Sequence, residues 1–387
     1  MTEAQKDHWR AVGDFFHSFW YMELIDRFGD VPWVDQVLQE DSPEAYGPRV
    51  DRKTVADKVL ERLQWAEQNI GNFTSQDGDN TINQDCVRAV ISRFGLREGT
   101  WRKYHELGDA EKYLQECVRA SELLMAAYPT LYTGTDGQPG AGYGEMWTTE
   151  DLGQVPGIIL YKSYVKDINP MGMSYIEHTS SHYVEMNQNT VDLYLMKNGK
   201  PILADGSGYH GNKDMYAVFR DRDPRLYQTV ADSLRIMSAM GTNYTEGTSP
   251  TGYPTKKFLN DEWWVAGLDY CTGRLSPADA PCIRYAEVLL NYVEARYEIA
   301  QVGGNAFSQS DLDKSINELR DRQLTKWGDT EAKTMPKVQL NGSNLSVNGV
   351  VINDPARDPD VNPVLWEIRR ERRIELIMEG RRGEDLR

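Results

Sequence analysis

The sequence predicts a mostly α-helical protein with a large irregular, loop-rich insertion and few short strands. Apolar residues recur at helical spacing toward both ends of the 387-residue chain. The stretch between them is dense in Gly, Pro, Tyr, Thr, Ser and Asp, and its helical signals are weak. Helix pairs that recur about every 30–40 residues favour a tetratricopeptide-like α-α superhelix, although the literal repeat signature is absent.

These observations predict the organisation of the chain. We expect an N-terminal helical part (residues 1–128), an irregular part (129–279) and a C-terminal helical part (280–387) that packs back on the first. Together they would form one compact unit. Both ends look cut, since a helical pattern starts soon after Met1 and the last helix has no tail.

Each expected helix follows from apolar positions on one face. The segment 8–28 carries Trp9, Phe16 and Trp20 at helical spacing and ends at a Gly/Pro stop. Similar stripes predict helices over residues 53–70, 84–94, 109–128, 283–301 and about 363–379.

Composition excludes several classes of function. The chain has 43 basic and 59 acidic residues, a formal net charge of −16, so we expect no nucleic-acid binding. Mean hydropathy is −0.61, and no apolar run is long enough to span a bilayer. Tyr and Trp number 21 and 10 against 9 Phe. Because these two rings combine an apolar face with a polar edge, their excess suits a wet binding surface as well as a core.

No motif indicates a catalytic or metal centre. The phosphate-loop, zinc-helix and nucleophile-elbow patterns are absent, and carboxylates are too numerous for an acid/base pair to stand out. His178 and His182 are four residues apart, but the residues between them favour a loop. The acidic stretch 77–85 lacks EF-hand spacing. We expect no catalytic residue, no metal ligand and no cofactor, with a structural Ca²⁺ in that stretch as the open alternative.

The four cysteines form no C-x-x-C pair. Cys86 and Cys117 lie within apolar helical stripes, which indicates small core residues. Cys271 and Cys282 flank a short loop, so a disulfide between them in an oxidising compartment stays open.

The segment 366–382 is unusually rich in alternating Arg and Glu. Its i,i+3 and i,i+4 pairs indicate a structural helix and not a catalytic centre. Arg372 and Glu375 fall near its apolar face. We therefore expect partly buried pairs with Arg284 or Glu287 that hold the end helices together.

Five segments stand out in order along the chain: Phe28–Pro32, Leu96–Trp101, Arg220–Leu226, Ile283–Ala295 and Ile368–Leu386. They resemble motifs of the SusD/RagB family of outer-membrane glycan-binding lipoproteins, of the starch-utilisation-system type. The last segment is similar to the family's I-R-x-E-R-R-I-E-L-x-x-E-G-x-R-x-x-D-L helix, and the third to its N-R-D-P-R-L turn. Order and spacing agree across nearly the whole chain.

The resemblance implies a surface-facing lipoprotein of the cell outer membrane that binds glycans without catalysis. It implies a SusC-like TonB-dependent transporter as the partner. The family's lipidated cysteine has no counterpart here, so contact with the membrane would depend on an N-terminal anchor that this sequence lacks.

The family's shared motifs are structural, so they assign no ligand residue, and the choice rests on sugar chemistry. Sugar rings present apolar C–H faces to aromatic rings and hydroxyls to polar edges. The candidates are therefore Tyr and Trp residues of the irregular middle, for each of which core packing is the competing interpretation. They are Trp147, Tyr143, Tyr175, Tyr183, Tyr209, Trp263 and Trp264.

These expectations give one main hypothesis and two alternatives. The main hypothesis is non-catalytic capture of an oligosaccharide or polysaccharide at the cell surface, followed by delivery to the transporter. The first alternative is a helical-repeat scaffold or lid that binds the transporter and has no glycan affinity. The weaker alternative is a glycan hydrolase.

Overall fold

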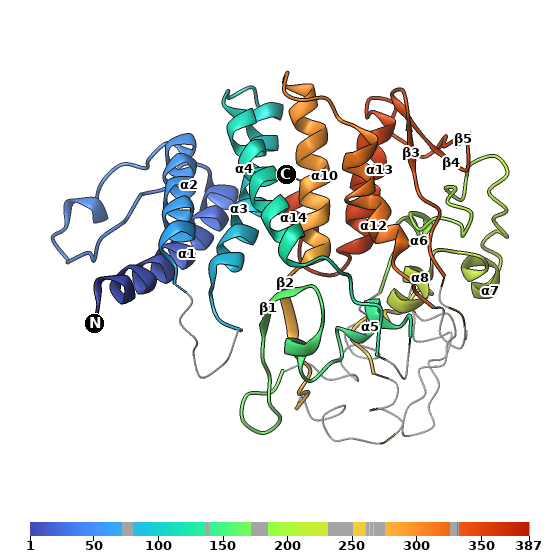
Figure 1. The fold of residues 1–387 in the computed structure, drawn as a ribbon, viewed down its shortest axis with the longest axis horizontal. Coiled ribbons are helices and arrows are strands. Elements are labelled where there is room, and N and C mark those ends of the chain that lie inside the picture. Colours follow the sequence, from blue (N-terminus) through green and yellow to red (C-terminus); the bar gives the residue numbers. More distant parts are fainter. Residues whose placement is uncertain are drawn as a thin grey trace. The chain divides into compact units, whose positions relative to one another are not determined.

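The chain is mostly α-helical with few short strands in the computed structural model, which confirms the predicted fold class (Figure 1). It divides into two units, residues 1–127 with 295–306 and residues 128–294 with 307–387. The three-part division and the superhelical stacking of the helix pairs stay predictions. The structure describes residues 1–71, 80–135, 139–171, 185–230, 251–260, 263, 266, 275–325, 331 and 333–386.

Long helices form most of the first unit, and capping side chains start three of them. Thr2 starts α1 (Glu3–Phe28) in a capping box with Gln5. Asp51 and Asn83 start the next two helices by accepting backbone N–H bonds. The pairs α1/α2 and α3/α4 each lie side by side (Figure 1). The other elements are η1 (Pro43–Ala45), α2 (Arg52–Asn69), α3 (Gln84–Tyr104), α4 (Ala110–Ala127) and the end of α10 (Tyr285–Gln301).

The stripe on α1 predicted the helix correctly but not its buried face. Trp9, Phe16 and Trp20 are 61%, 47% and 63% exposed. Both faces of α1 carry apolar residues, and periodicity alone does not say which face packs. The buried face instead holds Asp14, whose carboxylate accepts a hydrogen bond from Arg62 at 2.6 Å. Its other members are His8, Ala11, Phe15, Ser18, Tyr21, Met22 and Ile25.

The interface between α3 and α4 depends on a close backbone approach at Gly95. A Cβ atom at this position would lie 2.6 Å from the Tyr113 carbonyl oxygen and 2.8 Å from the Cys117 backbone nitrogen. Only glycine fits so near a neighbouring backbone. Cys86 and Cys117 are fully buried here, which confirms their prediction as core residues.

The second unit combines short helices, long loops and two small antiparallel sheets. Ile158 of β1 pairs with Arg284 of β2, and β3, β4 and β5 form a three-stranded sheet. Its elements include most of α10, together with α5 (Gly142–Glu145), η2 (Leu152–Gln154), β1 (Ile158–Lys162), α6 (Gln188–Asp192), α7 (Met215–Phe219), α8 (Pro224–Thr229), β2 (Ala280–Arg284), α11 (Gln309–Asp313), α12 (Ile316–Asp321), β3 (Gln339–Asn341), β4 (Asn344–Val347), β5 (Val350–Val351), α13 (Pro363–Glu375) and α14 (Arg382–Asp385).

A buried ion-pair network centred on α13 holds the second unit together. The fully buried Glu375 carboxylate accepts hydrogen bonds from Arg225 (3.2 Å), Arg284 (2.9 Å) and Arg322 (2.8 Å). The predicted pair between Glu375 and Arg284 is therefore confirmed. Because these arginines come from α8, β2 and the end of α12, one carboxylate joins segments that are distant in sequence.

Glu371 and Arg372 extend this network along the same helix. Arg225 and Arg320 donate to Glu371 at 2.8 and 2.9 Å. Burial raises the pKa of Glu371, but the charges of the surrounding arginines outweigh it and lower the pKa to about 2. Arg372 donates to Asp385 and Asn291, each at 2.7 Å.

Lys257 adds a fully buried ammonium group to this region. Its Nζ donates to the Ile377 carbonyl at 2.7 Å and to Glu379 at 2.9 Å. Burial is the main cause that lowers the pKa of Lys257 to about 8.

We expect Lys257 to make the free energy of unfolding rise between about pH 8 and pH 10. In this window the unfolded chain still binds the proton that the folded chain has lost, so stability increases with pH. The gain between pH 7.5 and 9.5 should be about 1–2 kcal/mol. Urea unfolding of the wild type and of Lys257→Met at both pH values measures it. An identical pH dependence in the two proteins would contradict this prediction.

Candidate functional site

Tyr143 is fully buried, so the expectation of an exposed ring at this position is wrong. Its hydroxyl donates to the carbonyl oxygens of Ile374 and Glu375, each at 3.1 Å. The guanidinium of Arg322 lies 5.1 Å from the centre of its ring. Tyr143 is thus part of the packing around α13. Its position after a glycine-rich loop gave no sign of this, because the residues that its hydroxyl contacts lie more than 200 residues away in the sequence.

Trp147 is 8% exposed, which also contradicts the expected exposed ring. It packs with Met146, Leu152 and Val155 in a small apolar cluster. The Lys257 ammonium lies 4.3 Å from the centre of its ring, within the range of a cation–π interaction. A ring covered in this way has no face free for a sugar.

The remaining candidates are only partly described. Tyr209 is half-buried, with the Arg222 guanidinium 5.3 Å from its ring centre. Trp263 is half-buried. The other three, Tyr175, Tyr183 and Trp264, lie outside the described residues.

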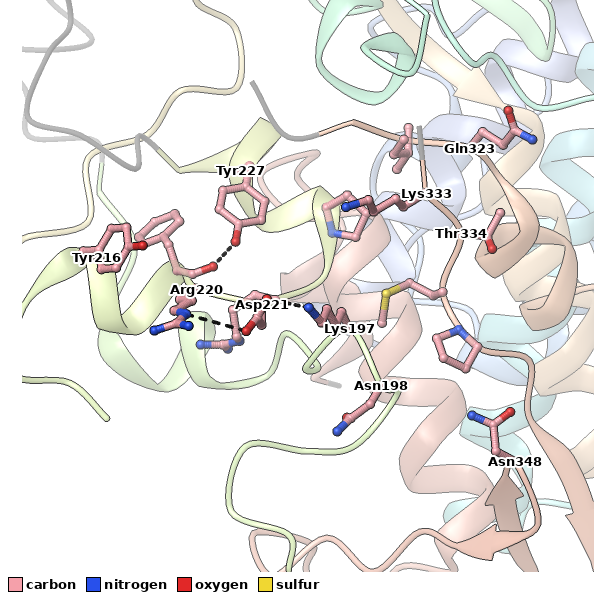
Figure 2. Close-up of a pocket in the computed structure, with 16 residues that line it drawn as sticks. Lys197, Asn198, Tyr216, Arg220, Asp221, Tyr227, Gln323, Lys333, Thr334 and Asn348 are labelled. Atoms are coloured by element: carbon pink, nitrogen blue, oxygen red, sulfur yellow. Dashed lines mark hydrogen bonds and ion pairs between the residues drawn. The ribbon is translucent and has the colours of Figure 1, made fainter. Parts of the chain in front are cut away.

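A cavity of about 930 Å³ lies in the second unit, and its volume is typical of small-ligand sites. One wall comes from Lys197, Asn198, and the segment from α7 to α8. The opposite wall comes from residues 323–324 and 333–336 and from Asn348. Figure 2 shows the side chains of both walls around this space, which we call the α7 pocket.

The first wall is held by backbone contacts around Arg222. Met196 pairs with Arg222 in an antiparallel bridge, and Gly199 (φ +81°) closes the adjoining turn in the left-handed region. The buried guanidinium of Arg222 donates to three backbone carbonyls, those of Val191, Tyr194 and Val218. Arg222 therefore supports this wall from within the protein, and the more exposed residues of the wall are available to contact a ligand.

The second wall is positioned by an isolated antiparallel bridge and by the pair of strands β4 and β5. Leu324 and Lys333 exchange backbone hydrogen bonds of 3.0 and 2.8 Å. Asn348 and Gly349 have φ values of +51° and +78° and join β4 to β5, as the Asn-Gly sequence favours. Both arrangements place a polar side chain at the pocket.

Tyr216 and four polar side chains offer binding groups that the described protein does not use. Tyr216 is 71% exposed. No hydrogen bond joins its hydroxyl, or the side chains of Gln323, Lys333, Thr334 and Asn348, to the described part of the chain. The pocket thus combines one exposed aromatic ring with side chains that donate and side chains that accept hydrogen bonds.

Asp221 is the charged centre of the first wall. Its carboxylate lies 2.6 Å from Lys197 Nζ and 3.7 Å from Arg220 Nε (Figure 2). It also lies 3.2 Å from His210 Nε2. The hydrogen bond from Lys197 is the main cause that lowers the pKa of Asp221. The carboxylate is therefore ionised at neutral pH and orients the basic groups around it.

Sequence reasoning missed Tyr216 although a signal was available. Ala217, Val218 and Phe219 are the buried residues of α7, and Tyr216, which precedes them, lies outside this buried run. Lys333 and Asn348 had no such signal, because only the folded chain brings them opposite α7.

Several other expectations stay untested. His178, His182, Cys271 and residues 77–79 lie outside the described residues, and Cys282 is exposed. In the described ranges, no group of three or more His, Cys, Asp or Glu side chains is placed to hold a metal ion. Over the same ranges, no helix has both the length and the apolar character needed to cross a membrane.

Comparison with known proteins points to one family. The model described as "SusD family" matches residues 162–387. A solved SusD-like carbohydrate binding protein from Bacteroides fragilis is 20% identical with a TM-score of 0.70; the match covers 100% of this chain and 67% of that one. A laminarin binding SusD-like protein is 19% identical with a TM-score of 0.58, over 100% of this chain and 71% of that one.

A third solved structure has the same fold. Surface glycan-binding protein A from Bacteroides uniformis is 14% identical with a TM-score of 0.58, over 100% of this chain and 67% of that one. No curated protein matches the chain.

Proposed function

The chain belongs to the SusD family, and from that premise we propose that it binds an oligosaccharide or polysaccharide in the α7 pocket. Three relatives of the same fold are described as binding carbohydrate, laminarin or glycan. The observation that carries the proposal is the open ring of Tyr216 beside polar groups that have no described protein partner.

The chemistry of the pocket suits a sugar. The apolar C–H face of a pyranose stacks on an aromatic ring, here Tyr216. Its hydroxyls both donate and accept hydrogen bonds, as do the amides of Gln323 and Asn348 and the hydroxyl of Thr334. The pocket is wide enough for more than one sugar unit.

The same pocket supports binding without catalysis. Glycoside hydrolysis ordinarily needs two carboxyl groups on opposite sides of the bond. Among the described residues that line the pocket, Asp221 is the one carboxylate. Its pKa is lowered and its oxygens are engaged by basic groups, so it is unsuited to act as a general acid.

Delivery to a SusC-like TonB-dependent transporter at the outer membrane is part of this proposal. Transient capture needs only a modest affinity, with a Kd of roughly 1 μM to 1 mM. Co-purification of the complete protein with such a transporter tests this step. Co-purification without any glycan affinity would favour the scaffold alternative.

The variant Tyr216→Ala tests the proposed site. Loss of the stacking ring should weaken glycan binding by about tenfold or more, equivalent to about 1.4 kcal/mol. Isothermal titration against a panel of neutral and acidic glycans measures the affinity. Tyr216→Phe keeps the ring and should retain most of it.

Tyr46→Ala is the matched control, because Tyr46 is also exposed, at 79%, and lies in the first unit. It should bind as the wild type does. Equal affinity in Tyr216→Ala and the wild type would remove the α7 pocket as the site, and a folded wild type that binds no glycan would remove the proposed function.

A further inference from the structure

The α7 pocket is basic, although the protein as a whole is acidic. The chain carries a formal net charge of −16. In contrast, the described residues that line the pocket include four basic side chains and one carboxylate, that of Asp221. The basic residues are Lys197, Arg220, Arg222 and Lys333. The described lining of the pocket therefore carries a net positive charge, whereas the whole chain carries a net negative charge.

Arg222 contributes to the positive charge of the pocket, but its guanidinium contacts the protein itself and is not available to a ligand. Its guanidinium is buried, and its two terminal nitrogens donate to backbone carbonyls, so these contacts serve the fold. The other three basic side chains differ, because none of them is buried. They are available to a ligand, and the fold does not require their charge.

One carboxylate does not neutralise these groups. Asp221 already lies near Lys197 at 2.6 Å, Arg220 at 3.7 Å and His210 at 3.2 Å. Lys333, on the opposite wall, is exposed and forms no ion pair with the described part of the chain (Figure 2). The basic side chains that line the pocket thus exceed the one carboxylate, which leaves an excess of positive charge there.

We infer that the α7 pocket takes an acidic glycan, one that carries uronate carboxylates or sulfate esters. This inference rests on the proposed function and names its substrate class. The anionic group lies among Lys197, Arg220 and Lys333, while the sugar ring stacks on Tyr216. A neutral glycan would need only the uncharged polar groups of the second wall, whereas an anion pairs with ammonium and guanidinium groups that the single carboxylate of Asp221 compensates only in part.

Matched glycan pairs test the inference by isothermal titration. Oligogalacturonate is compared with its methyl ester, and a sulfated carrageenan oligosaccharide with a neutral agarose oligosaccharide. In 50 mM NaCl, the acidic member of at least one pair should bind at least tenfold more tightly. In 300 mM NaCl, this preference should fall several-fold because salt screens the charges. The pair that shows the preference identifies carboxylate or sulfate as the recognised group.

Variants that remove a positive charge test whether the preference for acidic glycans arises in the α7 pocket. Lys333→Gln and Lys197→Gln should each weaken binding of the acidic glycan about threefold to tenfold, and Arg220→Gln provides a third variant if one of these fails to fold. Binding of a neutral glycan should weaken less than binding of the acidic glycan, because glutamine keeps a hydrogen-bond donor at each position and removes only the charge. Lys314→Gln, an exposed lysine outside the pocket lining, is the control and should behave as the wild type.

The outcomes separate this inference from the proposed function. Equal binding of acidic and neutral members overturns the inference and leaves glycan binding intact. An acidic preference that survives the lysine substitutions overturns the assignment of the charge to this pocket. Absence of binding to every glycan overturns both.

Discussion

Glu375→Gln should lower the free energy of unfolding by about 3–5 kcal/mol, the range for breaking a buried ion pair by removing one partner. Glu375 is fully buried, and its carboxylate accepts hydrogen bonds from Arg225, Arg284 and Arg322. Glutamine keeps the shape but removes the charge and turns an NH₂ group toward arginine donors. Three guanidinium groups would then share a single amide oxygen.

Urea unfolding at pH 7 measures this loss, and the near-ultraviolet spectrum reports whether the variant still folds. Glu61→Gln is the control, because Glu61 is exposed on α2. It should change stability by no more than about 0.5 kcal/mol. A comparably small effect in Glu375→Gln would show that the network tolerates loss of its central charge.

Gly95→Ala should destabilise the first unit by about 2–3 kcal/mol. The new Cβ would lie 2.6 Å from the Tyr113 carbonyl oxygen, so α3 and α4 have to move apart. Alanine favours a helix over glycine by about 1 kcal/mol, which is included in this net loss. Separation of the helices also loosens the contacts of Cys117, which is fully buried in the same interface.

The same substitution at Gly13 is the control, because it should have the opposite sign. Gly13 lies within α1 and has no atom within 4 Å of a Cβ placed there. Gly13→Ala should raise stability by about 0.5–1 kcal/mol through helix propensity alone. Thermal unfolding of both variants and of the wild type measures the two changes in stability. A stabilising Gly95→Ala would mean that the helices separate without cost.

Periodicity predicted the long helices because their apolar residues recur at helical spacing, even in α10, which is buried on nearly all sides. The expected segment 53–70 is α2 almost residue for residue. The same reasoning failed for the buried face of α1, since a helix that is apolar on two sides has no unique inner face. The pair between Arg284 and Glu375 was predictable because Glu375 fell near the apolar face of the last helix, where a charge needs a partner.

The amino-acid composition indicated where aromatic residues are concentrated, but not which residues form the site. An excess of Tyr and Trp in the middle of the chain says that rings are present there, but not which of them fold inward. Tyr143 and Trp147 became core residues through contacts with α13 and Lys257. The α7 pocket needs two segments more than 100 residues apart, and nothing local in the sequence records that they meet.

The ion pairs of α13 also determine when, during synthesis of the chain, the second unit can complete its folding. Arg225 meets Glu371 and Glu375 across separations of 146 and 150 residues. A nascent chain that has not yet released those glutamates has no carboxylates from α13 to offer to Arg225, Arg284 and Arg320. These ion pairs of the second unit therefore form only after α13 has been synthesised, and ribosomal stalling before α13 would leave the three arginines without their α13 partners.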